Sequence, residues 1–219
     1  MWKKITSIIP EYAIIPLLAS VVFNFVAYLV PKFVVDPSDY HSLAIPGVDS
    51  AIPFVTFFAL PYVLAFVQWV IGFIVIARES REWCLRLVIT DVIAKLSCMV
   101  FFLVYPTAIE IPEVVGNSPF DLIARIIYFF DTPTNLFPSI HCVESWICIR
   151  MTLPLRRVPD WYKHSMFICS LFVFASVVFI KQHYVVDIFA GILLFEVVYF
   201  VVNKTRAYRL GARIFPFFN

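Results

Sequence analysis

Charged residues are scarce in this sequence. Lysine, arginine, aspartate and glutamate make up 15% of its 219 residues, against about a quarter in soluble domains. A formal net charge of +2 provides no basic surface for nucleic acid, so we expect no nucleic-acid partner. The five cysteines form no CxxC pair, which argues against disulfide or metal use. With 62% apolar residues and a mean hydropathy of +0.89, a cytosolic globular enzyme and a disordered chain are both excluded.

Long apolar runs take up most of the chain. Because about 20 apolar residues cross a bilayer, the runs predict six membrane-spanning helices. Their ranges are 13–30, 54–77, 87–106, 139–153, 164–180 and 184–203. Little sequence is left for a separate soluble domain, so residues 1–219 are expected to form one all-α polytopic membrane domain. The segment 119–131 is too short to span and contains polar residues, which favours an interfacial helix.

Basic residues are concentrated in alternate connections. The N-terminus, the C-terminal tail and the connections after the second and fourth spans contain 13 of the 17 lysines and arginines. The connections 31–53 and 107–138 contain only Lys32 and Arg125 against seven acids. These acids are Asp36, Asp39, Asp49, Glu110, Glu113, Asp121 and Asp131. The positive-inside rule therefore predicts a multi-pass protein of a bacterial cell membrane, with cytoplasmic termini and an extracytoplasmic interfacial helix.

Two histidines begin predicted spans. His141 lies at the start of the fourth span and His183 at the start of the sixth, and both ends face outward in the predicted topology. Asp187 follows His183 by four residues, so it lies one helical turn further along the same face. Ionisable residues within a bilayer are costly and are functional candidates by default. We therefore predict that His141, His183 and Asp187 form one extracytoplasmic catalytic site.

The sequence around these residues carries two short motifs. Residues 135–141 read Asn-Leu-Phe-Pro-Ser-Ile-His, and residues 181–191 read Lys-Gln-His-Tyr-Val-Val-Asp-Ile-Phe-Ala-Gly. They resemble the second motif, Pro-Ser-Gly-His, and the third motif, Ser-Arg-x5-His-x3-Asp, of the type 2 phosphatidic acid phosphatase superfamily. The matching residues are Pro138, Ser139, His141, Ser176, His183 and Asp187. The wording Phe-Pro-Ser-x-His and His-Tyr-x-x-Asp is closest to the branch that contains inositol phosphorylceramide synthases.

The sequence departs from the superfamily pattern in its arginines. Val177 stands where the third motif has arginine, and Ile140 replaces the glycine of the second motif. The first motif, Lys-x6-Arg-Pro, is not present, and Ile111 precedes the proline where its arginine is expected. The positive charge for a phosphate then has to come from elsewhere. The candidate cations are Lys95, Lys181 and Arg125.

The resemblance implies hydrolysis or transfer of a lipid phosphate at the outer face, without metal or cofactor. His183 would be the nucleophile, oriented by Asp187, and would form a phosphohistidine. His141 would donate a proton to the leaving group and then activate the acceptor. Ser139, the free N–H groups at the start of the fourth helix and Lys181 would bind the phosphate. Lys95 is included in the same phosphate-binding set.

The sequence leaves several alternatives open. Lys181 can instead extend towards the lipid headgroups, and Lys95 can form an ion pair with Asp91 one turn away. Water as acceptor makes the protein a lipid phosphatase, whereas a lipid alcohol makes it a head-group phosphotransferase. The expected partners are membrane lipids and a lipid phosphate substrate, while the particular lipid and the oligomeric state are not determined.

Two further classes of protein compete with this interpretation. The first is a metal-dependent intramembrane enzyme, with His141, Glu144, His183 and Asp187 as a two-histidine, two-carboxylate metal site. The second is a non-catalytic scaffold or transporter that keeps the fold without the arginines. The intact set of two histidines and one aspartate favours the enzyme.

Overall fold

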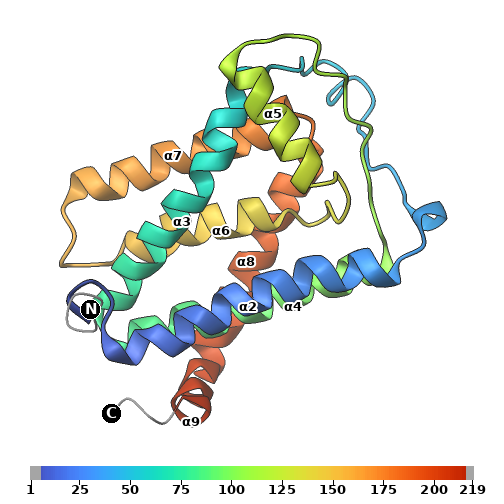
Figure 1. The fold of residues 1–219 in the computed structure, drawn as a ribbon. Helices are drawn as coiled ribbons and strands as arrows, with labels where there is room; N and C mark the ends of the chain where they lie inside the picture. The colour runs from blue at the N-terminus through green and yellow to red at the C-terminus, as the bar shows by residue number, and fades with distance from the viewer. Residues whose placement is uncertain (1–5, 216–219) are drawn as a thin grey trace.

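The computed structural model describes residues 6–215, which form helices joined by loops (Figure 1). The α-helices are α2 (Glu11–Val34), α3 (Ala59–Glu79), α4 (Arg81–Val104), α5 (Pro119–Phe130), α6 (Ile140–Thr152), α7 (Asp160–Phe179), α8 (Val185–Thr205) and α9 (Gly211–Ile214). Short 3-10 turns are η1 (Pro37–Asp39), η2 (Thr56–Phe58) and η3 (Ala207–Leu210). Within residues 6–215, extended pairing is limited to two isolated bridges, so the expected all-α class is confirmed.

Within the described part of the chain, five helices are long and apolar enough to cross a membrane. They are α2, α3 together with η2, α4, α7 and α8, and they coincide with five of the six predicted spans. The remaining predicted span, 139–153, contains α6, which has only 13 residues. At about 1.5 Å per residue this helix is about 20 Å long, shorter than a hydrocarbon core of about 30 Å. The count of six spans therefore stays a prediction.

The short helix α6 lies at the centre of the bundle. It packs against α3, α4, α7 and α8, and most of its side chains are buried. Ile147 and Met151 join the largest apolar core together with Phe102 of α4 and Phe195 of α8. A helix enclosed by protein needs no lipid-facing apolar stripe. This explains why α6 is less apolar than the helices around it.

The outer surface of the long helices is apolar. Large side chains such as Phe33, Phe66, Leu171 and Phe200 are exposed on α2, α3, α7 and α8. A soluble monomer rarely exposes so much contiguous apolar surface. Together with the length of the helices, this surface is that of a multi-pass membrane protein.

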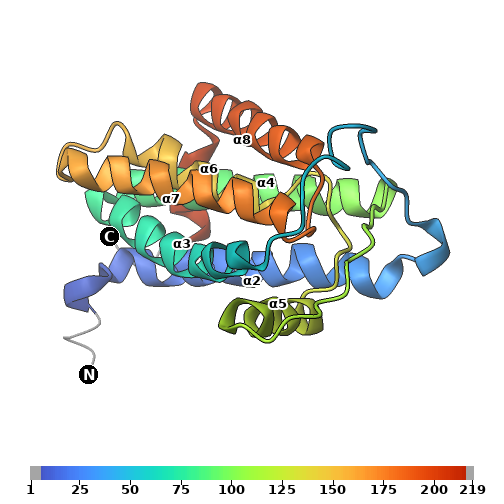
Figure 2. The same cartoon turned by 90° about the horizontal axis from the view of Figure 1, so that it is seen from above.

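The predicted interfacial segment 119–131 forms α5, which lies outside the row of long helices (Figure 2). Ser118 caps this helix, and its hydroxyl donates to Asp121 Oδ2 at 2.6 Å, which lowers the pKa of that carboxyl. Ala124 and Ile127 are buried in an apolar cluster shared with α3 and α7, whereas Phe129 is exposed. The position of α5 at a membrane surface remains a prediction.

The ends of the bundle differ in the connections that they carry. The α3–α4 and α6–α7 connections lie at the same end as the start of α2 and the helix α9, and the two long acidic connections lie at the other end (Figure 1). Backbone hydrogen bonds join these long connections, from His41 N to Pro106 O at 2.9 Å and from Ala108 N to His41 O at 3.0 Å. The starts of α6 and α8 also lie towards this second end.

Candidate active site

The start of α6 is held by contacts from two other segments and by its own cap. Thr107 Oγ1 accepts hydrogen bonds from Leu136 N at 3.2 Å and Phe137 N at 3.1 Å, which fixes the chain just before α6. Ser139 N donates to Asp187 O of α8 at 3.2 Å. Its hydroxyl caps the helix by accepting from Cys142 N at 3.4 Å. The second motif is therefore attached directly to the third.

Gly191 allows α8 to pass close to this helix start. A Cβ atom at position 191 would lie 2.7 Å from Ser139 O and 3.3 Å from Cys142 Cβ. The nearest obstacle is a backbone oxygen, which has no rotamer with which to move away. Glycine at this position therefore permits the approach of α8 to Ser139.

A compact turn between α7 and α8 places His183. The carbonyl of Val177 accepts hydrogen bonds from both Gln182 N and His183 N at 2.9 Å. Lys181 has a φ of 52°, in the left-handed region, and this allows the chain to reverse within a few residues. Val177, which occupies the position of the third-motif arginine, is fully buried and acts here through its backbone. Ser176 donates to Val173 O within its own helix.

His183 lies between two oxygen atoms. Its Nδ1 is 3.3 Å from Asp187 Oδ2, and its Nε2 is 3.1 Å from Ser139 Oγ. The same carboxylate oxygen accepts from Tyr184 N at 2.9 Å, so Asp187 is fixed by the backbone at the start of α8. A fully buried carboxylate favours a proton on Nδ1 and leaves the lone pair of Nε2 available. This is the arrangement that a nucleophilic imidazole requires.

His141 lies across the same site. Its ring stacks on Tyr62 with a centroid distance of 4.5 Å, and its centroid is 5.8 Å from that of His183. Trp69 packs on it with a centroid distance of 5.3 Å. The Nε2 atom of His141 is buried and has no hydrogen-bond partner among residues 6–215. A buried unpaired imidazole nitrogen is ready to receive or donate a proton to a bound group.

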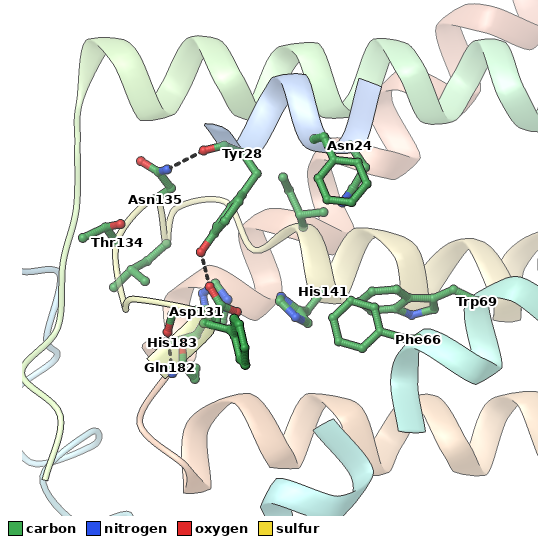
Figure 3. Close-up of a pocket in the computed structure, with 14 residues that line it drawn as sticks. Asn24, Tyr28, Phe66, Trp69, Asp131, Thr134, Asn135, His141, Gln182 and His183 are labelled. Carbon is green, nitrogen blue, oxygen red and sulfur yellow. Dashed lines mark hydrogen bonds between the residues drawn. The ribbon is translucent and has the colours of Figure 1, made fainter. Parts of the chain in front are cut away.

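Both histidines line a cavity of about 240 Å³. Figure 3 shows His141, His183 and Asp131 around this space. The other lining residues are Asn24, Phe25, Tyr28, Phe66, Trp69, Phe130, Thr134, Asn135, Leu136, Ile140 and Gln182. Among these described residues there is no lysine or arginine. Neutral amide, hydroxyl and aromatic groups therefore dominate the lining.

Asp131 is a lining residue that the sequence did not identify as part of the site. Tyr62 donates to its Oδ2 at 2.5 Å, and Tyr28 donates to its Oδ1. Lys32 donates to Tyr28 OH and, at 2.7 Å, to Thr132 Oγ1. The ammonium of Lys32 therefore contacts a residue that lines the cavity without lining the cavity itself. Asp131 was one of seven acids in the outward connections, and nothing in its sequence context distinguished it from the others.

The structure places both predicted phosphate-binding lysines away from the cavity. Lys95 Nζ is 2.8 Å from Asp91 Oδ2 and 2.5 Å from Glu144 Oε1, so the ion-pair alternative describes its position. Lys181 Nζ donates to Asp49 O at 3.0 Å and Ile52 O at 2.6 Å. It therefore ties the α2–α3 connection to the α7–α8 turn. Because neither ammonium lines the cavity, neither contacts a phosphate bound beside His183 in this arrangement.

The metal-site alternative needs the Glu144 carboxylate beside the two histidines. That carboxylate instead binds Lys95 in the interior of the bundle. In residues 6–215 no group of three or more histidine, cysteine, aspartate or glutamate side chains is arranged to hold a metal ion. The residues that the alternative requires therefore do not come together.

A family model described as the PAP2 superfamily matches residues 126–201. This match covers about a third of the chain and contains Ser139, His141, His183 and Asp187. It supports the superfamily suggested by the motifs, whose members are generally phosphatases. No curated protein sequence matches the chain.

Proposed function

We propose that this protein is a membrane lipid phosphatase of the type 2 phosphatidic acid phosphatase superfamily. The observation that carries the proposal is the row Ser139–His183–Asp187, joined by contacts of 3.1 and 3.3 Å, with His141 in the same cavity. The family match to residues 126–201 supports it independently.

In the first step, the lone pair of His183 Nε2 attacks the phosphorus of the ester. The bond from phosphorus to the leaving oxygen breaks, and that oxygen takes a proton from His141. Asp187 accepts the hydrogen bond of Nδ1–H and stabilises the positive charge that develops on the ring. The product of this step is a phosphohistidine and a free lipid alcohol.

In the second step, His141 removes a proton from water, and the water oxygen attacks the same phosphorus. The phosphorus–nitrogen bond breaks, inorganic phosphate leaves, and His183 regains its lone pair. Ser139 Oγ lies 3.1 Å from Nε2 and provides a hydrogen bond to a phosphate oxygen. The free N–H groups at the start of α6 would donate to the other phosphate oxygens. No step requires a metal ion or cofactor.

The lining of the cavity supports a lipid substrate. Phe25 of α2, Phe66 of α3 and Phe130 at the end of α5 all line the cavity, and all are exposed on the outer surface. The cavity therefore borders the surface that lipid chains would contact. A phosphate headgroup can reach the histidines from this side while its chains stay in the bilayer. By the positive-inside rule, the site then faces the extracytoplasmic side.

A head-group phosphotransferase, similar to inositol phosphorylceramide synthases, is the second candidate. It is favoured by the neutral polar groups in the cavity, namely Asn24, Thr134, Asn135 and Gln182. Hydroxyl and amide groups of this kind can hold an alcohol in place of the attacking water. The donor would be a phosphodiester lipid, whose lipid alcohol leaves when His183 attacks the phosphorus. His141 would then remove the proton of the acceptor alcohol, whose oxygen attacks the phosphorus; the phosphorus–nitrogen bond breaks, and the phospho-head-group passes from His183 to a second lipid.

The test uses purified protein in detergent with a chelator and a panel of lipid phosphates, with and without a lipid alcohol. Inorganic phosphate and new phospholipid are both quantified. The proposal predicts phosphate release; new phospholipid with little phosphate would establish the transferase instead. If no product forms across the panel, the enzyme proposal fails and the non-catalytic scaffold or transporter becomes the better account.

A matched pair of histidine variants distinguishes this site from contaminating activity. His183→Gln is expected to abolish turnover. His164→Gln is expected to retain it, because His164 is exposed on α7 and its hydrogen bond within the described residues is to Asp160 O of its own helix. Equal activity of the two variants would contradict the proposal.

A further inference from the structure

A second group of ionisable side chains lies in the interior of the bundle. Asp91 and Lys95 of α4 meet Glu144 of α6 and Ser20 of α2. All four are almost fully buried; Asp91 has no exposed surface and Glu144 is 4% exposed. Asp91 is ten residues into the 24-residue helix α4, so the group lies near the middle of that helix. The proposed reaction uses none of these residues.

The formal charges of this group do not balance. Two carboxylates and one ammonium give one net negative charge, and a charge buried in an apolar interior costs several kcal/mol or more unless it is compensated. The compensating charge does not come from another ion pair in residues 6–215, because each of these three side chains pairs only within the group. One further positive charge is therefore required.

Two oxygen atoms of the group also have no partner. Asp91 Oδ1 and Glu144 Oε2 are buried and accept no hydrogen bond from the described residues. The other two carboxylate oxygens bind the same nitrogen, Lys95 Nζ, at 2.8 and 2.5 Å, so the carboxyl groups are neighbours. Neighbouring carboxyl groups commonly hold one proton between them, since both cannot ionise at low cost.

Hydrogen bonding identifies the carboxyl group that carries this proton. Asp91 Oδ2 accepts from Ser20 Oγ at 2.5 Å and from Lys95, which stabilises its ionised form. Among the described residues, Glu144 accepts a hydrogen bond only from Lys95. We infer that Asp91, Lys95 and Glu144 form a proton-binding site in the membrane interior, in which Glu144 carries the proton while Asp91 and Lys95 are ionised.

The surroundings of the site contain few other groups that titrate. On α4 and α6 these are the buried thiols of Cys98 and Cys148, one turn from Lys95 and Glu144. From α3, the ring of Phe73 lies 5.8 Å from Lys95 Nζ. From α2 the site receives the Ser20 hydroxyl, and α8 adds apolar side chains to the same core. The proton on Glu144 thus keeps a contact between α2, α4 and α6 electrically neutral.

Infrared spectroscopy of the purified protein at neutral pH tests the inference. The wild type is expected to show a carboxylic-acid C=O band that shifts when glutamate, but not aspartate, is labelled with carbon-13. Glu144→Gln is expected to lose this band and to keep the fold, because glutamine has the shape of a protonated glutamate. The control Glu196→Gln, in a half-exposed pair with Arg150, is expected to lose only ionised carboxylate signal.

Two outcomes would overturn the inference. The first is a wild-type spectrum without a glutamate-sensitive acid band, which is informative even if Glu144→Gln fails to fold. The second is a thermal midpoint that rises with sodium at constant ionic strength in the wild type but not in Glu144→Gln, which would make the ligand a metal cation.

The pH dependence of stability gives an independent readout. The folded protein binds a proton that an exposed glutamate releases above a pH of about 4.3. Because the folded state then holds more protons than the unfolded state, stability falls as pH rises. The thermal midpoint of the wild type is therefore expected to fall relative to that of Glu144→Gln as the pH rises above about 4.3, until the folded protein has released the proton. Parallel curves for the two proteins would count against the inference.

Discussion

At the residue scale, the central feature is the pairing of His183 with Asp187. His183 lies in the turn before α8 and Asp187 lies in the first turn of that helix, and their side chains are 3.3 Å apart. The carboxylate also accepts a hydrogen bond from Tyr184 N, which holds it in place. The fixed carboxylate therefore sets the orientation of the imidazole. Its role in the proposed reaction is to keep the proton on Nδ1 and the lone pair on Nε2.

The Asp187→Asn variant tests this orienting role. Asparagine keeps the shape but can present an N–H to Nδ1, which favours the wrong tautomer of His183. We expect kcat to fall by about 10²-fold to 10⁴-fold, as for other oriented histidines. A circular dichroism spectrum and thermal midpoint near those of the wild type would show that the loss is chemical. An unchanged kcat would show that Asp187 only caps α8.

The residues of the motifs were predictable, whereas their polar neighbours were not. His141 and His183 could be paired because two short motifs fall at helix starts on the same predicted side. Lys95 and Lys181 were expected near the phosphate because positive charge was missing from the motifs. Their positions depend on partners distant in sequence, Glu144 for one and residues 49–52 for the other. Asp131 likewise enters the cavity only through its tertiary contacts with Tyr28 and Tyr62.

At the scale of the elements, the site depends on how α8 crosses the start of α6. Gly191 permits this approach, and the hydrogen bond from Ser139 N to Asp187 O fixes it. The apolar runs of the sequence located both helices, because each run is bounded by turn residues; the run that contains α6 is the shorter of the two. It did not predict the close crossing, since a glycine within an apolar helix is compatible with several kinds of packing.

The Gly191→Ala variant tests the crossing. The added methyl group would lie 2.7 Å from Ser139 O, so the helices must separate. Overpacking of this kind costs about 1–3 kcal/mol, and the Ser139–His183 contact should lengthen. We expect a lower thermal midpoint together with reduced kcat. The control Leu193→Ala, at an exposed position on the same helix, should retain activity; equal losses in both variants would contradict this account.

At the scale of the whole molecule, the basic and the acidic connections between helices lie at opposite ends of the bundle. The start of α2, the helix α9 and the two basic connections lie at one end of the bundle, and the two acidic connections pack together at the other (Figure 1). The alternation of charge in the sequence predicted this separation. The short α6 was harder to interpret, because a helix buried by protein on all sides carries a weaker apolar signal than one that faces lipid.

Membrane-impermeant thiol labelling in intact cells tests the orientation. In a background where Cys169 is serine, Asn117→Cys lies in the acidic end and Arg156→Cys in the basic end, and both positions are exposed. We expect Asn117→Cys to react from outside and Arg156→Cys to react only after permeabilisation. The reverse pattern would place the site on the cytoplasmic side.

The most direct test of the central claim is the detection of phosphate bound to His183. Protein is mixed in chelator with a lipid phosphate labelled at phosphorus, quenched rapidly and analysed by peptide mass spectrometry. The wild type should carry an acid-labile, alkali-stable label on His183. The label should persist longer in His141→Ala, because water is no longer activated, and it should be absent from His183→Gln. Turnover by His183→Gln, or a label on another residue, would contradict the mechanism.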